Sequence, residues 1–212
     1  MTGLWLNKVA DEYCTNIECI NTENMEREIY NTNQIMVEEG MKRVILSIDI
    51  VNMYPSLNKE VVKEEVSKLV VNSSIEINNL NWRMLSIYLS LNVDKEKLKK
   101  LGLISLIPTR KANTKGKMNE ESFEWLNTSP NETQIRKMMG LLCEVLIEII
   151  MTSHSYTVGD KIFLQLIGGP IGLDLTRVLA RVLTYLVTLK LIGPFSLQKF
   201  SLNFHQTKRL QN

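Results

Sequence analysis

The chain of 212 residues is 44% hydrophobic and 23% charged, and its formal net charge is +2. This length suits one sizeable core rather than two independent domains, and so small a net charge does not by itself indicate a polyanionic partner. Three cysteines without a C-x-x-C pair and two histidines without ligand-like spacing support neither a disulfide framework nor a zinc site. We therefore expect an intracellular protein of the nucleus or cytoplasm, where thiols stay reduced.

Residues 1–41 have weak helical periodicity and predict short helices. The first residues lack the basic stretch followed by a long apolar one that marks a secretion signal. The most apolar segment, Val178 to Ile192, is interrupted by Arg181 and Lys190 and is too short to cross a bilayer. We therefore expect a soluble protein with no membrane partner.

Lys42 and Arg43 lead into an apolar strand that ends near Ile50 and contains one acid, Asp49. A carboxylate in a strand that is buried on both faces is unfavourable unless a hydrogen-bond network, a cation or a metal pairs with it. At the carboxyl end of a central strand, Asp49 and the carbonyl of Ile50 could face one Mg²⁺ ion, which completes its shell with water and substrate phosphates. Tyr54 follows where a flat ring could form the floor of a sugar pocket. In the simpler interpretation, Asp49 is a turn or capping residue and Tyr54 is a packing aromatic.

Two helices are predicted after this turn. Asn58 can cap a helix from about Lys59 to Val71, whose apolar residues follow the spacing of one helical face: Val62, Val66, Leu69 and Val70. A second helix is expected over residues 81–91. Together with the strand, these helices make up the segment 42–93.

Residues 94–128 turn basic and then polar, and we interpret them as a loop or an insertion. Between Asp94 and Lys117, eight lysines and arginines oppose two acids. Such a run is usually a solvated surface, but it could contact the phosphates of a nucleic acid through Arg110, Lys111, Lys115 and Lys117.

The segment 129–193 begins with a helix start at Ser129, Pro130 and Glu132. That helix should run to about Met151 and bury Ile135, Met138, Leu142, Val145, Leu146 and Ile149. Next, SYTVGDKIFLQL alternates around a Gly-Asp pair and predicts a β-hairpin. The glycine-rich stretch IGGPIGLDLT then leads into a long helix that ends before residue 193, and residues 194–212 are expected to form a tail.

Two of these stretches resemble motifs of the reverse transcriptases. SIDIVNMYPSLNKEVVKEEV looks like motif A, in which an aspartate in a hydrophobic strand is followed five residues later by an aromatic. YTVGDKIFLQLIGGPIGLDLTRVLARVL resembles motif B, in the Q-x-x-G-x-x-x-G form of Penelope-like retroelements, here Gln165, Gly168 and Gly172. The two matches cover 65 of the 212 positions, and their order along the chain is that of the family.

The resemblance implies a fold and a set of roles. The fold would be α+β: a partial right-hand polymerase palm, with a small antiparallel sheet packed on helices and a short helical amino-terminal region left from the fingers. Asp49 would be a catalytic ligand of Mg²⁺, together with the carbonyl of Ile50, and Tyr54 would be the steric gate for the sugar. A nucleotide-binding turn would be formed by Gln165, Gly168, Gly169, Pro170 and Gly172, although the Gly-Gly-Pro sequence alone is also an ordinary tight turn. The family substrates are an RNA or DNA template–primer and deoxynucleotides.

The sequence also departs from the family. Two-metal nucleotidyl transfer needs several carboxylates, which reverse transcriptases complete with a Y-x-D-D hairpin after motif B. Here no Asp-Asp occurs, and no acid follows Asp174. We therefore expect an incomplete domain that does not polymerise alone. Asp174 places an anion beside a template-binding turn, and Arg181 stands where the family commonly has a neutral polar residue.

Two alternatives remain open. DIVNMYPSL also resembles the D-x-x-S-L-Y-P-S-I motif of family B DNA polymerases, although their lysine-bearing helix ending in N-S-x-Y-G is absent downstream. The chain could instead be a non-catalytic remnant that binds nucleic acid through its basic segment, or associates with itself through exposed core residues.

Overall fold

The computed structural model describes residues 2–14, 22–40, 55, 57–77, 80–112, 116, 119–126, 129–165, 168–169 and 174–192. Within these ranges the α-helices are α1 (Thr2–Cys14), α2 (Thr22–Glu39), α3 (Lys59–Asn72), α4 (Trp82–Asn92), α5 (Lys95–Lys100), α6 (Glu132–Ser153) and α7 (Asp174–Ile192). Two short 3-10 helices span Ile104–Leu106 and Glu120–Ser122. Two antiparallel hairpins pair β1 (Thr109–Arg110) with β2 (Phe123–Glu124) and β3 (Ser155–Val158) with β4 (Lys161–Leu164). This mixture of helices and small antiparallel sheets agrees with the predicted α+β class.

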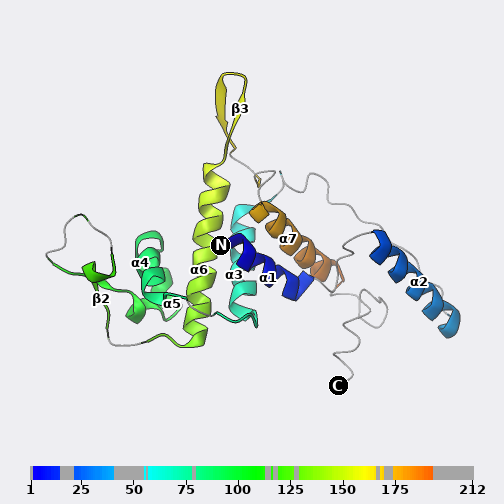
Figure 1. Cartoon of the computed structure of the whole chain (residues 1–212), viewed down its shortest axis with the longest axis horizontal. Helices are drawn as coiled ribbons and strands as arrows, with labels where there is room; N and C mark the ends of the chain where they lie inside the picture. Colours follow the sequence, from blue (N-terminus) through cyan, green and yellow to red (C-terminus); the bar gives the residue numbers. More distant parts are fainter. Residues whose placement is uncertain are drawn as a thin grey trace.

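The core forms where α3 packs along α6, α1 packs on α7, and α4 contacts α6 (Figure 1). The side chain of Asn58 caps α3 by accepting hydrogen bonds from the backbone nitrogens of Glu60 (3.0 Å) and Val61 (3.1 Å). The buried stripe of α3 is the predicted one: Val62, Val66, Leu69 and Val70. The predictions of this helix, its cap and its buried face are therefore confirmed.

Helix α6 differs from its prediction in its start and in its buried face. Its N-cap is Asn131, which forms a capping box with Gln134, so Ser129 is not the cap. The apolar side chains it buries are Met138, Met139, Leu141, Cys143, Ile147 and Met151. Only Met138 belongs to the predicted set, and Ile149 is 44% exposed. Because α6 is apolar around most of its circumference and contacts both α3 and α4, periodicity alone does not select the buried face.

Gly140 sets how closely α3 and α6 approach. A Cβ atom on Gly140 would lie 2.8 Å from Ser67 Oγ and 3.2 Å from the carbonyl oxygen of Ser67. Such distances are shorter than ordinary contacts, so a larger side chain would force the two helices apart.

The described residues of the segment 94–128 contain helical and strand structure, where a loop or an insertion was predicted. Asp94 caps α5 by accepting a hydrogen bond from the backbone nitrogen of Glu96 (3.2 Å), and Lys97 forms an ion pair with Glu144 of α6. Leu98, Leu103 and Leu106 are each at most 2% exposed. The interpretation as a loop was wrong here because the frequent lysines masked the regularly spaced leucines that anchor this segment to the core.

The β3–β4 hairpin extends beyond the carboxyl end of α6 (Figure 1), and its eight strand residues are all exposed. Its two-residue turn, Gly159 and Asp160, is the predicted one, and Gly159 has a φ of 59°. We expected a small antiparallel sheet packed on helices. Instead, the β3–β4 hairpin continues past the core, and the strands of β1–β2 are only two residues long. The strand predicted to end near Ile50 and the predicted tail at 194–212 lie outside the described residues.

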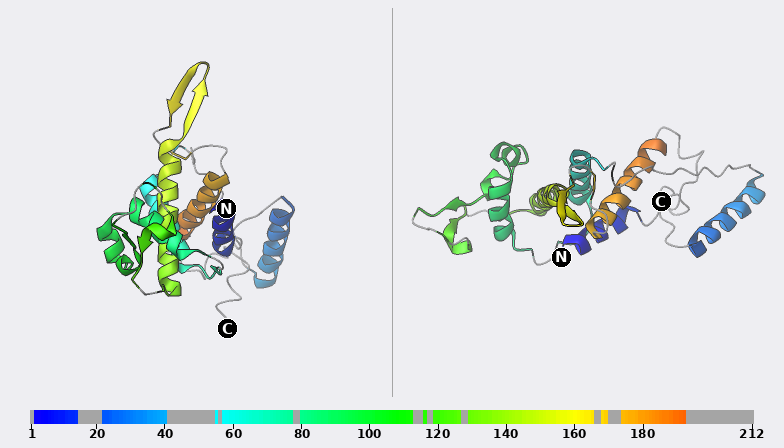
Figure 2. Two further views of the ribbon diagram at one scale, coloured as in Figure 1. Left: turned by 60° about the vertical axis from the view of Figure 1, so that its left-hand side comes forward. Right: turned by 90° about the horizontal axis from the view of Figure 1, so that it is seen from above.

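Helix α2 stands apart from the other labelled helices in all views (Figure 2). Both amino-terminal helices were predicted, although α2, at 18 residues, is longer than expected. No helix in the described ranges is both long and apolar enough to span a membrane.

We expect the substitution Gly140→Leu to lower the free energy of unfolding by about 1–3 kcal/mol, because the added side chain collides with Ser67 across the α3–α6 contact. Urea unfolding followed by far-ultraviolet circular dichroism measures this change. Thr133→Leu adds an equally large side chain at an exposed position of the same helix and should change stability by no more than about 0.5 kcal/mol. Equal effects of the two substitutions would show that the helices are not held this closely.

Candidate functional site

The predicted site residues divide into those that the structure describes and those that it does not. Outside the described residues lie Asp49, Ile50, Tyr54, Pro170, Gly172, Lys115 and Lys117. Described are Gln165, Gly168, Gly169, Arg110 and Lys111. The geometry of the site is therefore built from the residues that adjoin the two motif-like stretches.

Gln165, Gly168 and Gly169 form what we call the glycine turn. The backbone nitrogen of Gln165 donates to the carbonyl of His154 (2.9 Å), which continues the β3–β4 ladder by one residue. The Gln165 side chain then donates through Nε2 to the carbonyl of Gly169 (3.2 Å). Gly168 has a φ of 81°, a conformation that side chains disfavour. The glutamine thus fixes the turn at its start, and glycine permits its curvature.

Gly169 is the point at which the two motif-like stretches meet. A Cβ atom built there would lie 2.6 Å from Leu57 Cδ1 and 2.8 Å from Thr176 Cγ2. Leu57, the last residue of the stretch SIDIVNMYPSL, is only 5% exposed. Only glycine fits this position without moving a neighbour, so Leu57 packs directly on the backbone of the glycine turn.

Thr176, in the first turn of α7, is a residue that the sequence reasoning missed. It is 1% exposed, and its buried Oγ1 atom has no hydrogen-bond partner among the residues that the structure describes. An unpaired buried hydroxyl costs about 1–3 kcal/mol and calls for an explanation. The signal in the sequence was a threonine in the first turn of the helix that follows the glycine-rich stretch.

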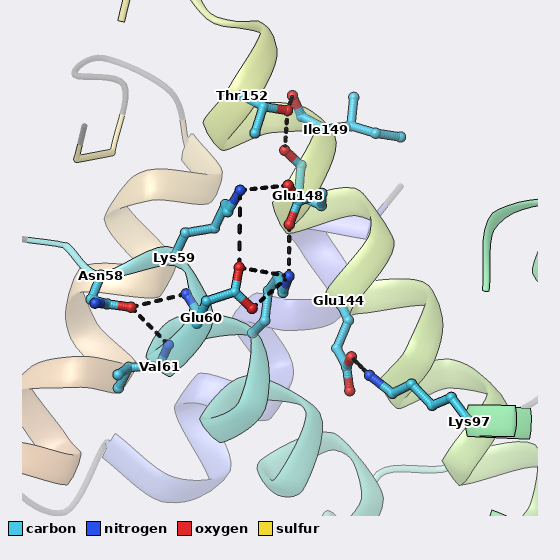
Figure 3. A network of polar contacts seen from close by, with 10 residues as sticks. Asn58, Lys59, Glu60, Val61, Lys97, Glu144, Glu148, Ile149 and Thr152 are labelled. Carbon is cyan, nitrogen blue, oxygen red and sulfur yellow. Dashed lines mark hydrogen bonds and ion pairs between the residues drawn. The ribbon is translucent and has the colours of Figure 1, made fainter. Parts of the chain in front are cut away.

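An ion-pair cluster holds the start of α3 on α6 (Figure 3). Glu148 accepts hydrogen bonds from Lys59 Nζ (2.5 Å) and Lys63 Nζ (2.6 Å), and Lys63 also pairs with Glu60. The bonds from Lys59 and Lys63 lower the pKa of Glu148. Burial alone would lower the pKa of Lys63, but its bonds to Glu148 and Glu60 outweigh that effect and raise it. Because α3 follows Leu57 directly, this cluster also positions one side of the glycine turn.

Helix α7 is tied to α1 on its other side. Arg181 Nη2 pairs with Asp11 Oδ1 (2.9 Å), and Cys14 Sγ lies 3.8 Å from the carbonyl oxygen of Arg181. Arg181, which departs from the family pattern, thus has a structural partner. Burial raises the pKa of the Cys143 thiol in α6 to about 12, so this cysteine is not a candidate nucleophile.

Arg110 and Lys111, two of the four residues predicted to contact phosphates, lie in or beside the β1–β2 hairpin. Arg110 pairs in register with Phe123 in the β1–β2 hairpin, and the backbone nitrogen of Lys111 donates to the carbonyl of Ser122 (3.0 Å). Figures 1 and 2 show this hairpin and α7 on opposite sides of α6. Arg110 and Lys111 are therefore not brought to the glycine turn.

The described residues include no group of three or more His, Cys, Asp or Glu side chains that could hold a metal ion. Comparisons with protein families, with curated proteins and with solved structures find no match for the chain. The glycine turn itself offers a backbone without a Cβ atom, an adjacent buried hydroxyl and a fixed glutamine. Gly168 and Gly169 are both buried, and Leu57 and Thr176 occupy the space beside Gly169, so the missing Cβ atoms allow two chain segments to pack closely.

We expect Gly169→Ala to lower the free energy of unfolding by about 1–3 kcal/mol, because its methyl group would overlap with Leu57 and Thr176. Leu57→Ala removes one of these obstacles, so the double variant should lose less stability than the two single variants together, with a coupling of about 0.5–3 kcal/mol. Urea unfolding of all four proteins measures this coupling. Combining Leu57→Ala with Gly102→Ala, which has nothing within 4 Å of its Cβ position, serves as the additive control. Strict additivity for the Gly169 pair would contradict the contact.

We expect Glu148→Gln to destabilise the protein at neutral pH by less than about 1 kcal/mol, because the carboxylate is partly exposed to solvent. The pKa of Glu148 is lowered in the folded protein, so its contribution is complete above the ordinary carboxyl pKa and is lost as the pH falls through the lowered value. The stability difference from the wild type should therefore shrink on acidification. Chemical unfolding at about pH 7 and about pH 3 tests this, with the more exposed Glu64 of α3 as the matched substitution. A difference that grows in acid would refute the ion-pair assignment.

Proposed function

We propose that the chain is part of the palm of a reverse transcriptase of the Penelope-like retroelement type. The observation that carries this proposal is the contact of Leu57 with Gly169, because it joins the end of the motif-A-like stretch to the motif-B-like turn. In the family, these motifs build one nucleotide pocket. The contact brings together two stretches that lie 112 positions apart in the sequence.

The geometry of the glycine turn supports the same assignment. The Gln165 side chain donates a hydrogen bond to the carbonyl of Gly169. The positive φ of Gly168 bends the chain at the position of the first glycine in the family's Q-x-x-G motif. On this proposal the turn formed by Gln165, Gly168, Gly169, Pro170 and Gly172 supports the pocket for the incoming nucleotide and the templating base, and the buried Gly168 and Gly169 act by setting the shape of the turn. Tyr54 tests the sugar for a 2′-hydroxyl.

The sequence contains only some of the metal ligands that the family uses. Asp49 and the carbonyl of Ile50 would hold Mg²⁺, which when bound supplies charge for the triphosphate. Two-metal transfer needs further carboxylates, and the 212 residues contain no Asp-Asp pair. This donor set does not fit a complete two-metal centre, so we propose nucleotide binding without polymerisation by the chain alone.

The second candidate is a non-catalytic remnant that binds partners. It is favoured by the exposed apolar residues of the β3–β4 hairpin, among them Val158 (61% exposed) and Ile162 (75% exposed). It gives no reason for the fit of Leu57 against Gly169. The same GGPIG stretch argues against a family B DNA polymerase.

We expect the protein to bind a fluorescently labelled deoxynucleotide in the presence of Mg²⁺, as measured by anisotropy, and to extend no primed RNA template. Asp49→Asn and Gly169→Ala should each weaken this binding by at least about tenfold, or about 1.4 kcal/mol. Asp160→Asn, at the exposed tip of the hairpin, is the matched control and should bind as the wild type does. Circular dichroism confirms that each variant is folded.

Two outcomes would contradict this assignment. Binding that is unchanged in the Asp49 variant would remove the nucleotide pocket. Extension that depends on both Mg²⁺ and Asp49 would show that the chain polymerises despite its missing carboxylates.

A further inference from the structure

A cavity of about 650 Å³ opens between α4 and the β1–β2 hairpin, and its lining includes no residue of the glycine turn. Its volume falls within the range of small-ligand sites, roughly 300–1,000 Å³. We call it the aromatic–acidic groove, and its lining includes Trp82, Phe123, Trp125, Glu120, Glu121 and Glu124. Neither the polymerase resemblance nor the proposed function accounts for it.

The aromatic side of the groove is held in place by the fold. Trp82 and Trp125 meet edge to face, with ring centroids 6.4 Å apart and an interplanar angle of 81°. Phe123 packs against Trp125 at 6.3 Å. Trp125 Nε1 also donates to the buried hydroxyl of Ser86 (2.8 Å), so the indole cannot turn without losing a hydrogen bond. The two tryptophans therefore form a preorganised surface.

This surface already receives a cation from its own chain. The guanidinium carbon of Arg83 lies 5.7 Å from the ring centroid of Trp82 and 5.4 Å from that of Trp125. Both distances are within the range at which a cation is attracted to an aromatic face. Arg83 is exposed, so an incoming cation can displace it at little cost in packing.

The carboxylates of the groove outnumber its cations. Glu120 accepts a hydrogen bond from Asn81 Nδ2 (2.5 Å). In the described part of the chain, Glu121 and Glu124 take part in no ion pair or side-chain hydrogen bond. Three carboxylates against one guanidinium attract a second cation and repel phosphate.

We propose that the aromatic–acidic groove binds a cationic side chain, an arginine or a lysine carried by a peptide segment of a partner protein. The cation lies against the tryptophan pair in competition with Arg83, and Glu121 and Glu124 supply the opposing charge. Aromatic platforms also stack nucleic-acid bases, but such sites join their rings to basic grooves, whereas this one is acidic. This proposal does not rest on the polymerase assignment.

The test uses a fluorescein-labelled peptide of alternating glycine and arginine, its citrulline counterpart and labelled oligothymidylate, each titrated with the full chain. We expect the arginine peptide to bind and the citrulline peptide to bind at least about fivefold more weakly. The double substitution Glu121→Gln and Glu124→Gln should weaken arginine-peptide binding by about fivefold, because it removes two attractive charges. Arg83→Ala should strengthen that binding by about twofold to fivefold, because it removes the competing cation.

The control changes the net charge equally at a distant place. Glu26→Gln with Glu38→Gln, both exposed on α2, should leave peptide binding unchanged. No binding of the arginine peptide, or equal binding of the citrulline peptide, would overturn the proposal. Oligothymidylate binding that is strengthened by the glutamine pair and weakened by Arg83→Ala would overturn it as well, and would identify a nucleic-acid platform instead.

Discussion

The close approach of α3 and α6 at Gly140 is the constraint from which the arrangement of the glycine turn follows. Because Gly140 has no side chain, α3 can pack closely on α6. Leu57, just before the start of α3, is therefore held in a fixed place. Helix α6 then runs on into the β3–β4 hairpin, whose ladder ends at Gln165. Helices α3 and α6 run antiparallel, so the start of α3 and the end of α6 lie at the same end of the pair, where the two stretches that resemble polymerase motifs meet at Gly169.

Ion pairs between the helices add modest stabilisation to this packing. The Glu148 cluster links α3 to α6, the pair of Arg181 and Asp11 links α7 to α1, and the pair of Lys97 and Glu144 links α5 to α6. Each joins residues far apart in sequence and involves at least one half-buried partner. Such pairs are modest in energy, because solvent still reaches them, but they fix the register in which largely apolar helices pack.

Two chemically different regions lie on opposite sides of α6. The glycine turn is buried and tightly packed, whereas the aromatic–acidic groove offers indole faces and three carboxylates. The lysine-rich stretch that precedes the groove therefore does not make this side of the molecule uniformly basic. The glutamates of the groove follow the basic residues within a few positions of the sequence, and folding places these glutamates around Trp82 and Trp125.

The sequence by itself determined most of the local structure, because caps, stripes and turns depend on neighbouring residues. Asn58 and the stripe of α3, the Gly159–Asp160 hairpin turn and a long helix after the glycine-rich stretch were all predicted. It did not determine which side of α6 is buried, since an almost uniformly apolar helix takes its orientation from its neighbours. The leucines of residues 98–106 were also hidden by the surrounding lysines. Only the tertiary structure brought Leu57 to Gly169 and Glu148 to Lys59, because packing between distant segments leaves no periodic signal in the chain. The same holds for Trp82, Arg83 and Trp125, whose mutual contacts join the start of α4 to the residue that follows β2, some forty residues later.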